Sequence, residues 1–361
     1  MSVFMVNDVL YTVTENINLL RFLRDELHLT SVKDGCSEGA CGTCTVLIDG
    51  KAQKACTQKS QSLDGKKIIT TEGLSDREKE VYSYAFSEAG AVQCGFCIPG
   101  MVICAKALLD VNPSPTRQDV KKAIKNNLCR CTGYKKIEDA ILLASRIFRE
   151  NEEIPKPVFT GLLGENMHRR DAEGKILGTA KFADDYYMEN MVYGSALRSE
   201  YAKAKIISID KSEAEKMDGV LCVMTAEDIP GTQKIGHLRR DWDVIVPVGT
   251  ATHYLGDAVA LIAAETPEIL EKAKKAVKVE YKPMQGVFSP EESMKEDAAL
   301  VHMEGNLLAS EHLVRGDADK AIAESKYVVT NHYSVPFTEH AFMEPECAVA
   351  FPEDGGIHII S

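Results

Sequence analysis

The feature that most constrains this chain of 361 residues is the crowding of its cysteines, nine of 11 of which fall within residues 1–131. Eight of these nine form two sets with short, regular spacings. A secreted protein that depends on disulfides is usually short and rich in cysteine throughout. Cysteines gathered in one part of a longer chain indicate metal binding instead. The N-terminal third is therefore expected to fold around metal.

The first set has the spacing C-x4-C-x2-C followed by a distant cysteine, and comprises Cys36, Cys41, Cys44 and Cys56. This opening is typical of plant-type [2Fe–2S] clusters. Three glycines allow the backbone to fold closely around a compact cluster: Gly35, Gly39 and Gly42. Zinc is the alternative, but structural zinc ligands usually come as two close pairs, whereas one loop supplies three ligands here. We interpret the set as the ligands of an iron–sulfur cluster.

The second set is C-x2-C followed about thirty residues later by C-x-C, and comprises Cys94, Cys97, Cys129 and Cys131. Each pair stands at the end of a predicted helix, so a helical bundle can bring the two pairs together. By spacing alone, zinc and a second cluster are close rivals. Because C-x-C is unusual in structural zinc sites, the spacing favours iron and sulfide.

The remaining cysteines and the histidines have weaker signals. Cys104 lies in the apolar run MVICAKALL and Cys222 in GVLCVMT, and we expect both, with Cys347, to be small buried side chains. The nine histidines form no H-x3-H or H-E-x-x-H pair, which leaves a histidine-based metal site with little support. For His340, in TEHAFMEPE, a structural role is favoured over cofactor support.

Local patterns predict an α+β fold before residue 75 and four helices over 76–150. Residues 3–13 form one hairpin signal around Asn7-Asp8, and Asp49-Gly50 lies in a second. Between them, Asn16 or Asn18 can cap a helix. In the helical part, Pro99 marks a helix start and Thr116 with Asp119 forms a capping box.

Beyond the helices, the polar stretch 151–165 predicts a linker. Short strands and an amphipathic helix near 267–277 then predict a mixed domain over 166–285, and a further region covers 286–361.

Composition and missing motifs exclude several functions. The net charge of −12 argues against nucleic-acid binding. No apolar run approaches the ~20 residues of a membrane span, and no signal peptide is visible, so a cytoplasmic protein without membrane contact is expected. The chain has no G-x-G-x-x-G, P-loop or G-x-S-x-G motif, and we assign it no catalytic residue. Two one-electron centres need a further cofactor to oxidise a substrate by two electrons.

Taken together, these motifs resemble those of a known protein family. The segments DGCSEGACGTCTVLIDG, QCGFCIPGM and NNLCRCTGY closely resemble the iron–sulfur region of the xanthine dehydrogenase/aldehyde oxidoreductase family of molybdenum hydroxylases. GTAKFADDYYMENMVYGSALRSEYAKAKIISID and GVLCVMTAEDIPG resemble its α/β hammerhead domain. RGDADKAIAESKYVV and YSVPFTEHAFMEPECAVA resemble the start of its molybdenum-binding region.

The resemblance implies a multidomain α+β protein. It comprises a β-grasp plant-type ferredoxin domain (1–75), a four-helix [2Fe–2S] domain (76–150), the linker 151–165, the α/β hammerhead domain (166–285) and a partial molybdopterin-binding domain (286–361). It implies two [2Fe–2S] clusters and a molybdopterin cofactor. Gln93 matches a glutamine that contacts the pterin, and Cys131 matches a cluster ligand whose sulfur also hydrogen-bonds the pterin.

The resemblance also implies partners. Many members have a flavin domain where this sequence has only a short linker, so a separate FAD subunit or another electron acceptor is expected. The glycine-rich molybdopterin loops and the glutamate base of the family have no match here. We therefore expect the remaining molybdenum-binding polypeptide to complete the site, in an oligomer.

The expected reaction is hydroxylation of a purine such as xanthine. The alternatives are an aldehyde oxidoreductase and a non-catalytic electron-transfer protein without the molybdenum half.

Overall fold

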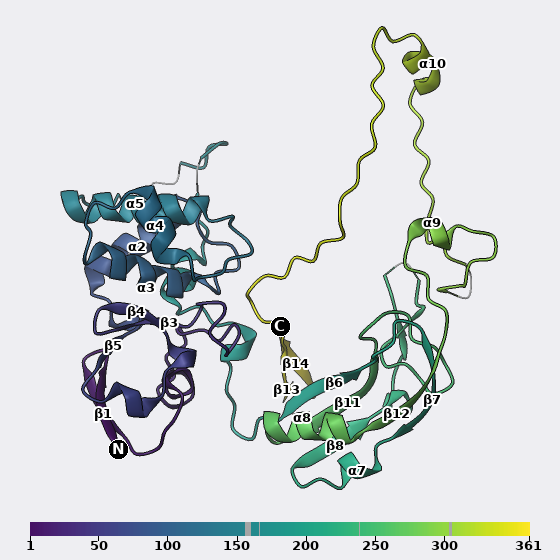
Figure 1. Cartoon of the computed structure of the whole chain (residues 1–361), viewed down its shortest axis with the longest axis horizontal. Coiled ribbons are helices and arrows are strands. Elements are labelled where there is room, and N and C mark those ends of the chain that lie inside the picture. Colours follow the sequence, from purple (N-terminus) through teal and green to yellow (C-terminus); the bar gives the residue numbers. More distant parts are fainter. Residues whose placement is uncertain (156–159, 166, 238, 303–304) are drawn as a thin grey trace. The chain divides into compact units, whose positions relative to one another are not determined.

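The computed structural model describes all residues except 156–159, 166, 238 and 303–304, and it forms two compact units (Figure 1). The first unit comprises residues 1–187 together with 334–361, and the second comprises residues 188–333. Residues 156–159 of the predicted linker lie outside the described residues, as do residue 166 and residues 238 and 303–304 of the two regions that follow. The domain boundaries expected from the sequence stay a prediction.

The first unit begins with a five-stranded sheet in the order β2-β1-β5-β3-β4. The strands are β1 (Ser2–Val6), β2 (Val9–Val13), β3 (Thr45–Ile48), β4 (Lys51–Lys54) and β5 (Lys67–Ile69). Both predicted hairpins are confirmed, and Asp49 and Gly50 have φ of 49° and 76°, as a tight two-residue turn requires. The sequence did not predict the three-residue β5, which joins the hairpins by pairing parallel to β1 and antiparallel to β3.

A short helix covers the sheet. The side chain of Asn18 accepts a hydrogen bond from the backbone N–H of Leu20 at 3.0 Å, which confirms the predicted cap of α1 (Leu19–Arg21). The helix continues as a π-helical turn over Phe22–Glu26. Leu19, Leu20 and Leu23 are fully buried in a core that includes the apolar face of the sheet.

The four predicted helices follow and are confirmed as α2 (Asp76–Glu88), α3 (Ile98–Leu109), α4 (Arg117–Ile124) and α5 (Lys135–Glu150). The capping box of Thr116 and Asp119 is present at the start of α4. A further helix, α6 (Ala172–Leu177), buries Ala172 and Ile176 in the same core as the four helices. The first unit ends with the hairpin β13 (Val349–Glu353) and β14 (Gly356–Ile360).

The second unit contains three small sheets in the orders β6-β11-β8, β7-β12 and β9-β10. The strands are β6 (Tyr193–Arg198), β7 (Ala204–Asp210), β8 (Val220–Met224), β9 (Lys234–Ile235), β10 (Trp242–Asp243), β11 (Ala258–Ala264) and β12 (Lys278–Pro283). The helices are α7 (Ser212–Glu215), α8 (Pro267–Ala276), α9 (Pro290–Ser293) and α10 (Ala318–Ala323). The predicted amphipathic helix is α8, which is capped by Thr266 and buries Leu270 and Ala273 against the sheet that contains β11.

The three solitary cysteines differ in burial. Cys104 is buried in α3, as predicted, and its thiol donates to the amide oxygen of Asn127 at 3.2 Å. The prediction of burial is wrong for Cys222 and Cys347, which are exposed. Cys222 lies on β8, an edge strand on which only Val223 is buried. Although the sequence of this strand is apolar, only one of its two faces packs against the core. Cys347 precedes β13 in a stretch without regular secondary structure.

In the part of the chain that the structure describes, no helix is both long and apolar enough to cross a membrane.

Candidate iron–sulfur and molybdopterin sites

The first cysteine set is brought together by the loop before β3 and by the turn after β4. Cys41, Cys44 and Cys56 are buried, and Cys36 is partly exposed. Within the set, Cys36 and Cys41 affect each other's pKa, as do Cys44 and Cys56, which indicates two pairs of neighbouring thiols. The charge interaction between Cys41 and Cys44 links the two pairs into one site.

Backbone N–H groups around this set point at sulfur. The N–H of Cys41 donates to Sγ of Cys36 at 3.4 Å, and the N–H of Cys56 donates to Sγ of Cys44 at 3.5 Å. The N–H of Thr43, in the same loop, donates to Sγ of Cys41 at 3.5 Å. A Cβ at Gly35 would lie only 3.1 Å from Sγ of Cys41. Such donors and close backbone approach are what a sulfur-rich cluster requires.

Burial disfavours charge on the free thiols of this set. It raises the pKa of Cys44 to about 12, and it also raises the pKa of Cys41. Both thiols therefore stay protonated near neutral pH unless a metal replaces the proton, because thiolate is the form that binds metal.

The second cysteine set lies among the helices. Cys94 and Cys97 precede α3, and Cys129 and Cys131 lie in the loop between α4 and α5. The thiols again form two pairs, Cys97 with Cys129 and Cys94 with Cys131. The hydrogen bond from Cys97 lowers the pKa of Cys129 to about 5, while the same bond, with burial, raises the pKa of Cys97.

The two-plus-two pairing in both sets fits a binuclear cluster better than a single ion. One tetrahedral zinc draws four sulfurs toward one point, whereas a [2Fe–2S] cluster places two ligands on each of two irons. The donor sets, four thiols each, thus fit [2Fe–2S] clusters.

The loops of the two sets are in direct contact. Gly42, with φ of 72°, lies so close to the second loop that a Cβ would be 2.2 Å from the carbonyl oxygen of Asn126. The buried amide of Asn127 donates to the carbonyl of Gly42 at 2.8 Å, and the N–H of Leu128 donates to the carbonyl of Cys41 at 2.8 Å. Sequence reasoning missed Asn127, although it lies two residues before Cys129.

The two residues predicted to face the pterin are neighbours. The amide of Gln93 donates to the carbonyl of Cys131 at 2.8 Å, and Arg169 donates to the carbonyl of Gln93 at 2.8 Å. The Gln93 side chain is exposed and Cys131 is partly exposed, so both can be reached from outside. An amide and a thiol at one accessible edge fit the hydrogen-bonding groups of a pterin.

The segment around His340 packs beside this edge through its backbone. Arg130, between two cysteines of the second set, donates to the carbonyls of His340 and Glu339 at 3.0 and 3.1 Å. The side chain of His340 is 88% exposed and contacts only Glu339 among the ion pairs of the described residues. The carbonyl of His340 thus helps to hold this segment, while the role of its side chain stays a prediction; sequence reasoning missed Arg130.

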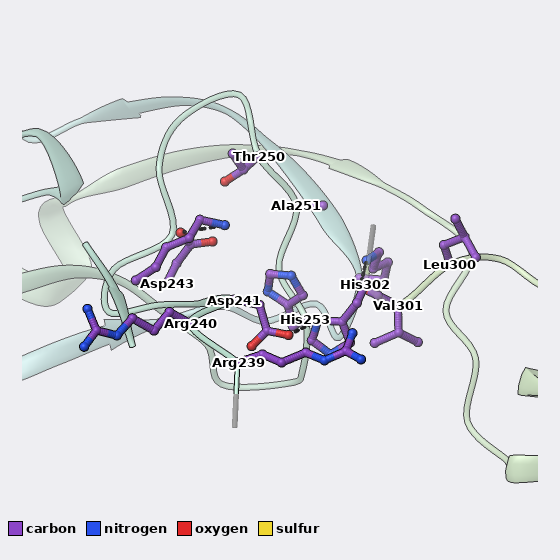
Figure 2. A pocket seen from close by; sticks show the side chains of 12 residues that line it. Arg239, Arg240, Asp241, Asp243, Thr250, Ala251, His253, Leu300, Val301 and His302 are labelled. Atoms are coloured by element: carbon purple, nitrogen blue, oxygen red, sulfur yellow. Dashed lines mark hydrogen bonds and ion pairs between the residues drawn. The ribbon is translucent and has the colours of Figure 1, made fainter. Parts of the chain in front are cut away.

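The second unit contains a cavity of about 880 Å³ that holds none of the predicted cofactor residues (Figure 2). Its lining includes Lys203, Asp241 and two stacked imidazoles, His253 and His302, whose ring centroids are 5.5 Å apart. No cysteine is among the described residues that line the cavity, so it is chemically unlike both cysteine sets.

Comparison with known proteins identifies each region. A 2Fe–2S iron–sulfur cluster binding domain matches residues 5–80, and a [2Fe–2S] binding domain matches 70–142. The a/b hammerhead domain of aldehyde oxidase and xanthine dehydrogenase matches 177–285, and a molybdopterin cofactor-binding domain matches 301–361. The chain thus contains two [2Fe–2S] domains, a hammerhead domain and part of a molybdopterin-binding domain.

Individual relatives agree. An aldehyde oxidoreductase of Megalodesulfovibrio gigas is 32% identical over 355 residues, covering 92% of this chain and 39% of that protein. The nicotinate dehydrogenase small FeS subunit of Eubacterium barkeri is 51% identical over 134 residues, covering 37% of this chain and 85% of the subunit.

Among solved structures, the aldehyde oxidoreductase of Desulfovibrio gigas matches 99% of this chain and 42% of its own, with a TM-score of 0.88 and 30% identity. This chain therefore spans about two fifths of the length of its long relatives. It belongs to the xanthine dehydrogenase/aldehyde oxidoreductase family of molybdenum hydroxylases.

Proposed function

We propose that this chain is the iron–sulfur and hammerhead part of a molybdenum hydroxylase, and that it carries electrons from a molybdopterin centre to a flavin subunit or another acceptor. The observation that carries the proposal is the pairing of thiols in two sets whose loops touch at Gly42 and Asn127. One [2Fe–2S] cluster is held by Cys36, Cys41, Cys44 and Cys56. The other is held by Cys94, Cys97, Cys129 and Cys131.

The order of electron transfer follows from which residues face outward. Gln93 and Cys131 lie together at an accessible edge of the second set, and we assign them to the pterin. When bound, the molybdopterin centre supplies the two-electron oxidation of a substrate carbon, with water as the source of oxygen. The cysteines of the second set would hold the cluster beside the pterin, and those of the first set would hold the cluster that passes electrons on to an acceptor. Cys36, the partly exposed ligand of the first cluster, marks the side on which an acceptor docks.

A molybdenum-binding partner polypeptide is supported by the surface of the molybdopterin region. Large apolar side chains there are almost fully exposed: Leu313, Tyr327, Val329 and Tyr333 in the second unit, and Val335 and Phe337 in the first. In each unit by itself, exposed apolar groups of this size mark surface that another part of a protein covers. We propose that the rest of the molybdopterin-binding region, on a partner polypeptide, covers them.

Two substrate classes are proposed, a purine such as xanthine and an aldehyde. The similarity to an aldehyde oxidoreductase over 92% of the chain favours the aldehyde. The test is to add either compound, without oxygen, to the purified protein with any partner that co-purifies, and to follow cluster absorbance. Bleaching by one compound identifies the class. If the purified protein shows cluster spectra but contains no molybdenum, and neither compound bleaches the clusters, the result would favour a non-catalytic electron carrier.

The cluster assignment is tested by Cys41→Ser. Because the two ligand sets are separate, this variant should lose one of two reduced-cluster EPR signals and keep the other. Wild-type protein should contain about four iron atoms per chain, two for each [2Fe–2S] cluster. The matched control is Cys104→Ser, which removes a buried cysteine outside both sets and should keep both signals. Equal loss of both signals in Cys41→Ser, or zinc replacing half the iron, would overturn the assignment.

A further inference from the structure

Four charged side chains of the first unit form a buried charge cluster: Arg24, Lys33, Asp184 and Asp185. Lys33 and Asp185 have no exposed side-chain surface, and Arg24 is nearly as buried. The ammonium of Lys33 contacts one carboxylate oxygen of Asp185, and Arg24 donates to the other at 3.0 Å. Asp184 lies 3.6 Å from the same guanidinium. The cluster holds two cations and two carboxylates and is formally neutral.

The buried charge cluster touches the loops that lead to both cysteine sets. Lys33 is three residues before Cys36, and Arg24 donates to the carbonyl of Val32 at 3.0 Å, which fixes the start of that loop. The Lys33 ammonium also lies 5.9 Å from the ring centre of Phe96, a residue of the Cys94–Cys97 loop.

A second ring completes the surroundings of the ammonium. Nζ of Lys33 lies 4.7 Å from the ring centre of Phe182, which packs edge-on against Phe96 at 5.2 Å. The lysine charge is thus enclosed by Asp185 and two aromatic rings, with no exposed surface of its own.

The stability of the fold does not by itself explain why Lys33 and Asp185 are charged residues at this buried position. Burial lowers the pKa of Lys33, which shows the desolvation that the ammonium suffers, and the contact with Asp185 opposes that effect. Well-packed apolar residues in place of a buried ion pair are often as stable or more so. A charge in a poorly polarisable interior, however, acts strongly on other charges nearby. The charge around an iron–sulfur cluster is one of the factors that set its reduction potential.

We propose that Lys33 raises the reduction potentials of the clusters held by the two cysteine sets, and that Asp185 limits this effect. The proposal rests on the function proposed above, because it requires clusters at those cysteines. Each cluster takes up one electron, which converts one ferric iron to ferrous and breaks no bond. A nearby positive charge stabilises the added negative charge, and a nearby carboxylate does the opposite.

The test is an EPR-monitored redox titration of the full chain, with any partner that co-purifies, using sodium dithionite as the reductant. Lys33→Met removes a positive charge and should lower the midpoint potentials of both clusters. Asp185→Asn removes a negative charge and should raise them. Lys33→Arg keeps the charge and should stay close to wild type. An electrostatic role shifts the midpoint potentials of Lys33→Met and Asp185→Asn in opposite directions. A loss of packing would shift the potentials of both variants in the same direction.

The matched control is Lys106→Met, which removes a half-buried lysine that pairs with Glu78 in the helical domain, away from the buried charge cluster. It should leave both potentials unchanged. Unchanged potentials in Lys33→Met, or shifts of the same sign in Lys33→Met and Asp185→Asn, would overturn the inference. If Lys33→Met does not fold, the test is Asp185→Asn against Lys33→Arg, and an unshifted Asp185→Asn overturns it. Wild-type protein without clusters would overturn the proposed function itself.

Discussion

At the scale of single residues, the spacing of cysteines predicted which side chains meet, and the structure brings each set together. The residues that join the sets were missed. Asn127 contacts Gly42 across 85 positions of sequence, and Lys33 contacts Asp185 across 152. A local pattern contains no information on such distant partners, and neither residue type is unusual where it stands. Motifs therefore predicted the candidate ligands but not their surroundings.

The contact between the two cysteine loops gives a prediction for Asn127. Asn127→Ala removes the hydrogen bonds of its amide to Gly42 and Thr45 and the one it accepts from Cys104. Loss of buried hydrogen bonds should cost about 1–3 kcal/mol in the free energy of unfolding. The measurement is the temperature at which cluster absorbance is lost on heating. Asn16→Ala, at an exposed position of the same unit, should not change it. An unchanged temperature for Asn127→Ala would show that the loops do not depend on this contact.

At the scale of elements, strong local signals were sufficient and short elements were not predictable. The two hairpins carry turn residues that tolerate positive φ. Among the four helices, α2 and α4 begin with capping boxes and α3 begins with a proline in its first turn. The strand β5 has three residues and α6 has six, too few to show any period. These elements are ordered by long-range packing: β5 by its neighbours in the sheet, and α6 by α2 and α3.

An ion pair joins the start of α2 to α3 and gives a prediction at this scale. Burial by itself would raise the pKa of Glu78, but hydrogen bonds from Lys106 and Ser75 outweigh it and lower that pKa. A carboxyl with a lowered pKa contributes stability above its unfolded pKa of about 4.3 and loses that contribution as the pH falls through the folded value. The pair of Glu78 and Lys106, 2.6 Å apart, is therefore fully charged from pH 6 to 8.

A double-mutant cycle of Glu78→Gln and Lys106→Met, followed by denaturant unfolding, should give a coupling free energy of about 1 kcal/mol that does not change over this pH range. The exposed pair Arg77 and Glu80 on the same helix is the control, and its coupling should be about half as large or less. A coupling that rises or falls between pH 6 and 8 would contradict the assigned direction of the Glu78 shift.

At the scale of the whole molecule, each unit has hydrophobic cores of its own. The first unit has one core in the sheet and one among the helices, and the second has two around β11 and β7. All eight cysteines of the two sets belong to the first unit. The sequence separated these regions by their motifs, but it did not predict that residues 334–361 group with the first unit, since that depends on contacts such as Arg130 with the carbonyl of His340.

This division predicts two signals on heating. Trp242, the single tryptophan of the chain, lies in the second unit, with its ring 5.4 Å from that of Tyr254. Its fluorescence therefore reports on the second unit, whereas visible absorbance reports on the clusters of the first.

Removing iron with a chelator under reducing conditions takes bound ligand away from the folded first unit and should destabilise that unit. The Trp242 transition should keep its midpoint, while the far-ultraviolet circular dichroism of the helices melts at a lower temperature. Cys41→Ser should reproduce this pattern in part. A Trp242 midpoint that falls together with that of the helices would show that the stabilities of the two units are coupled.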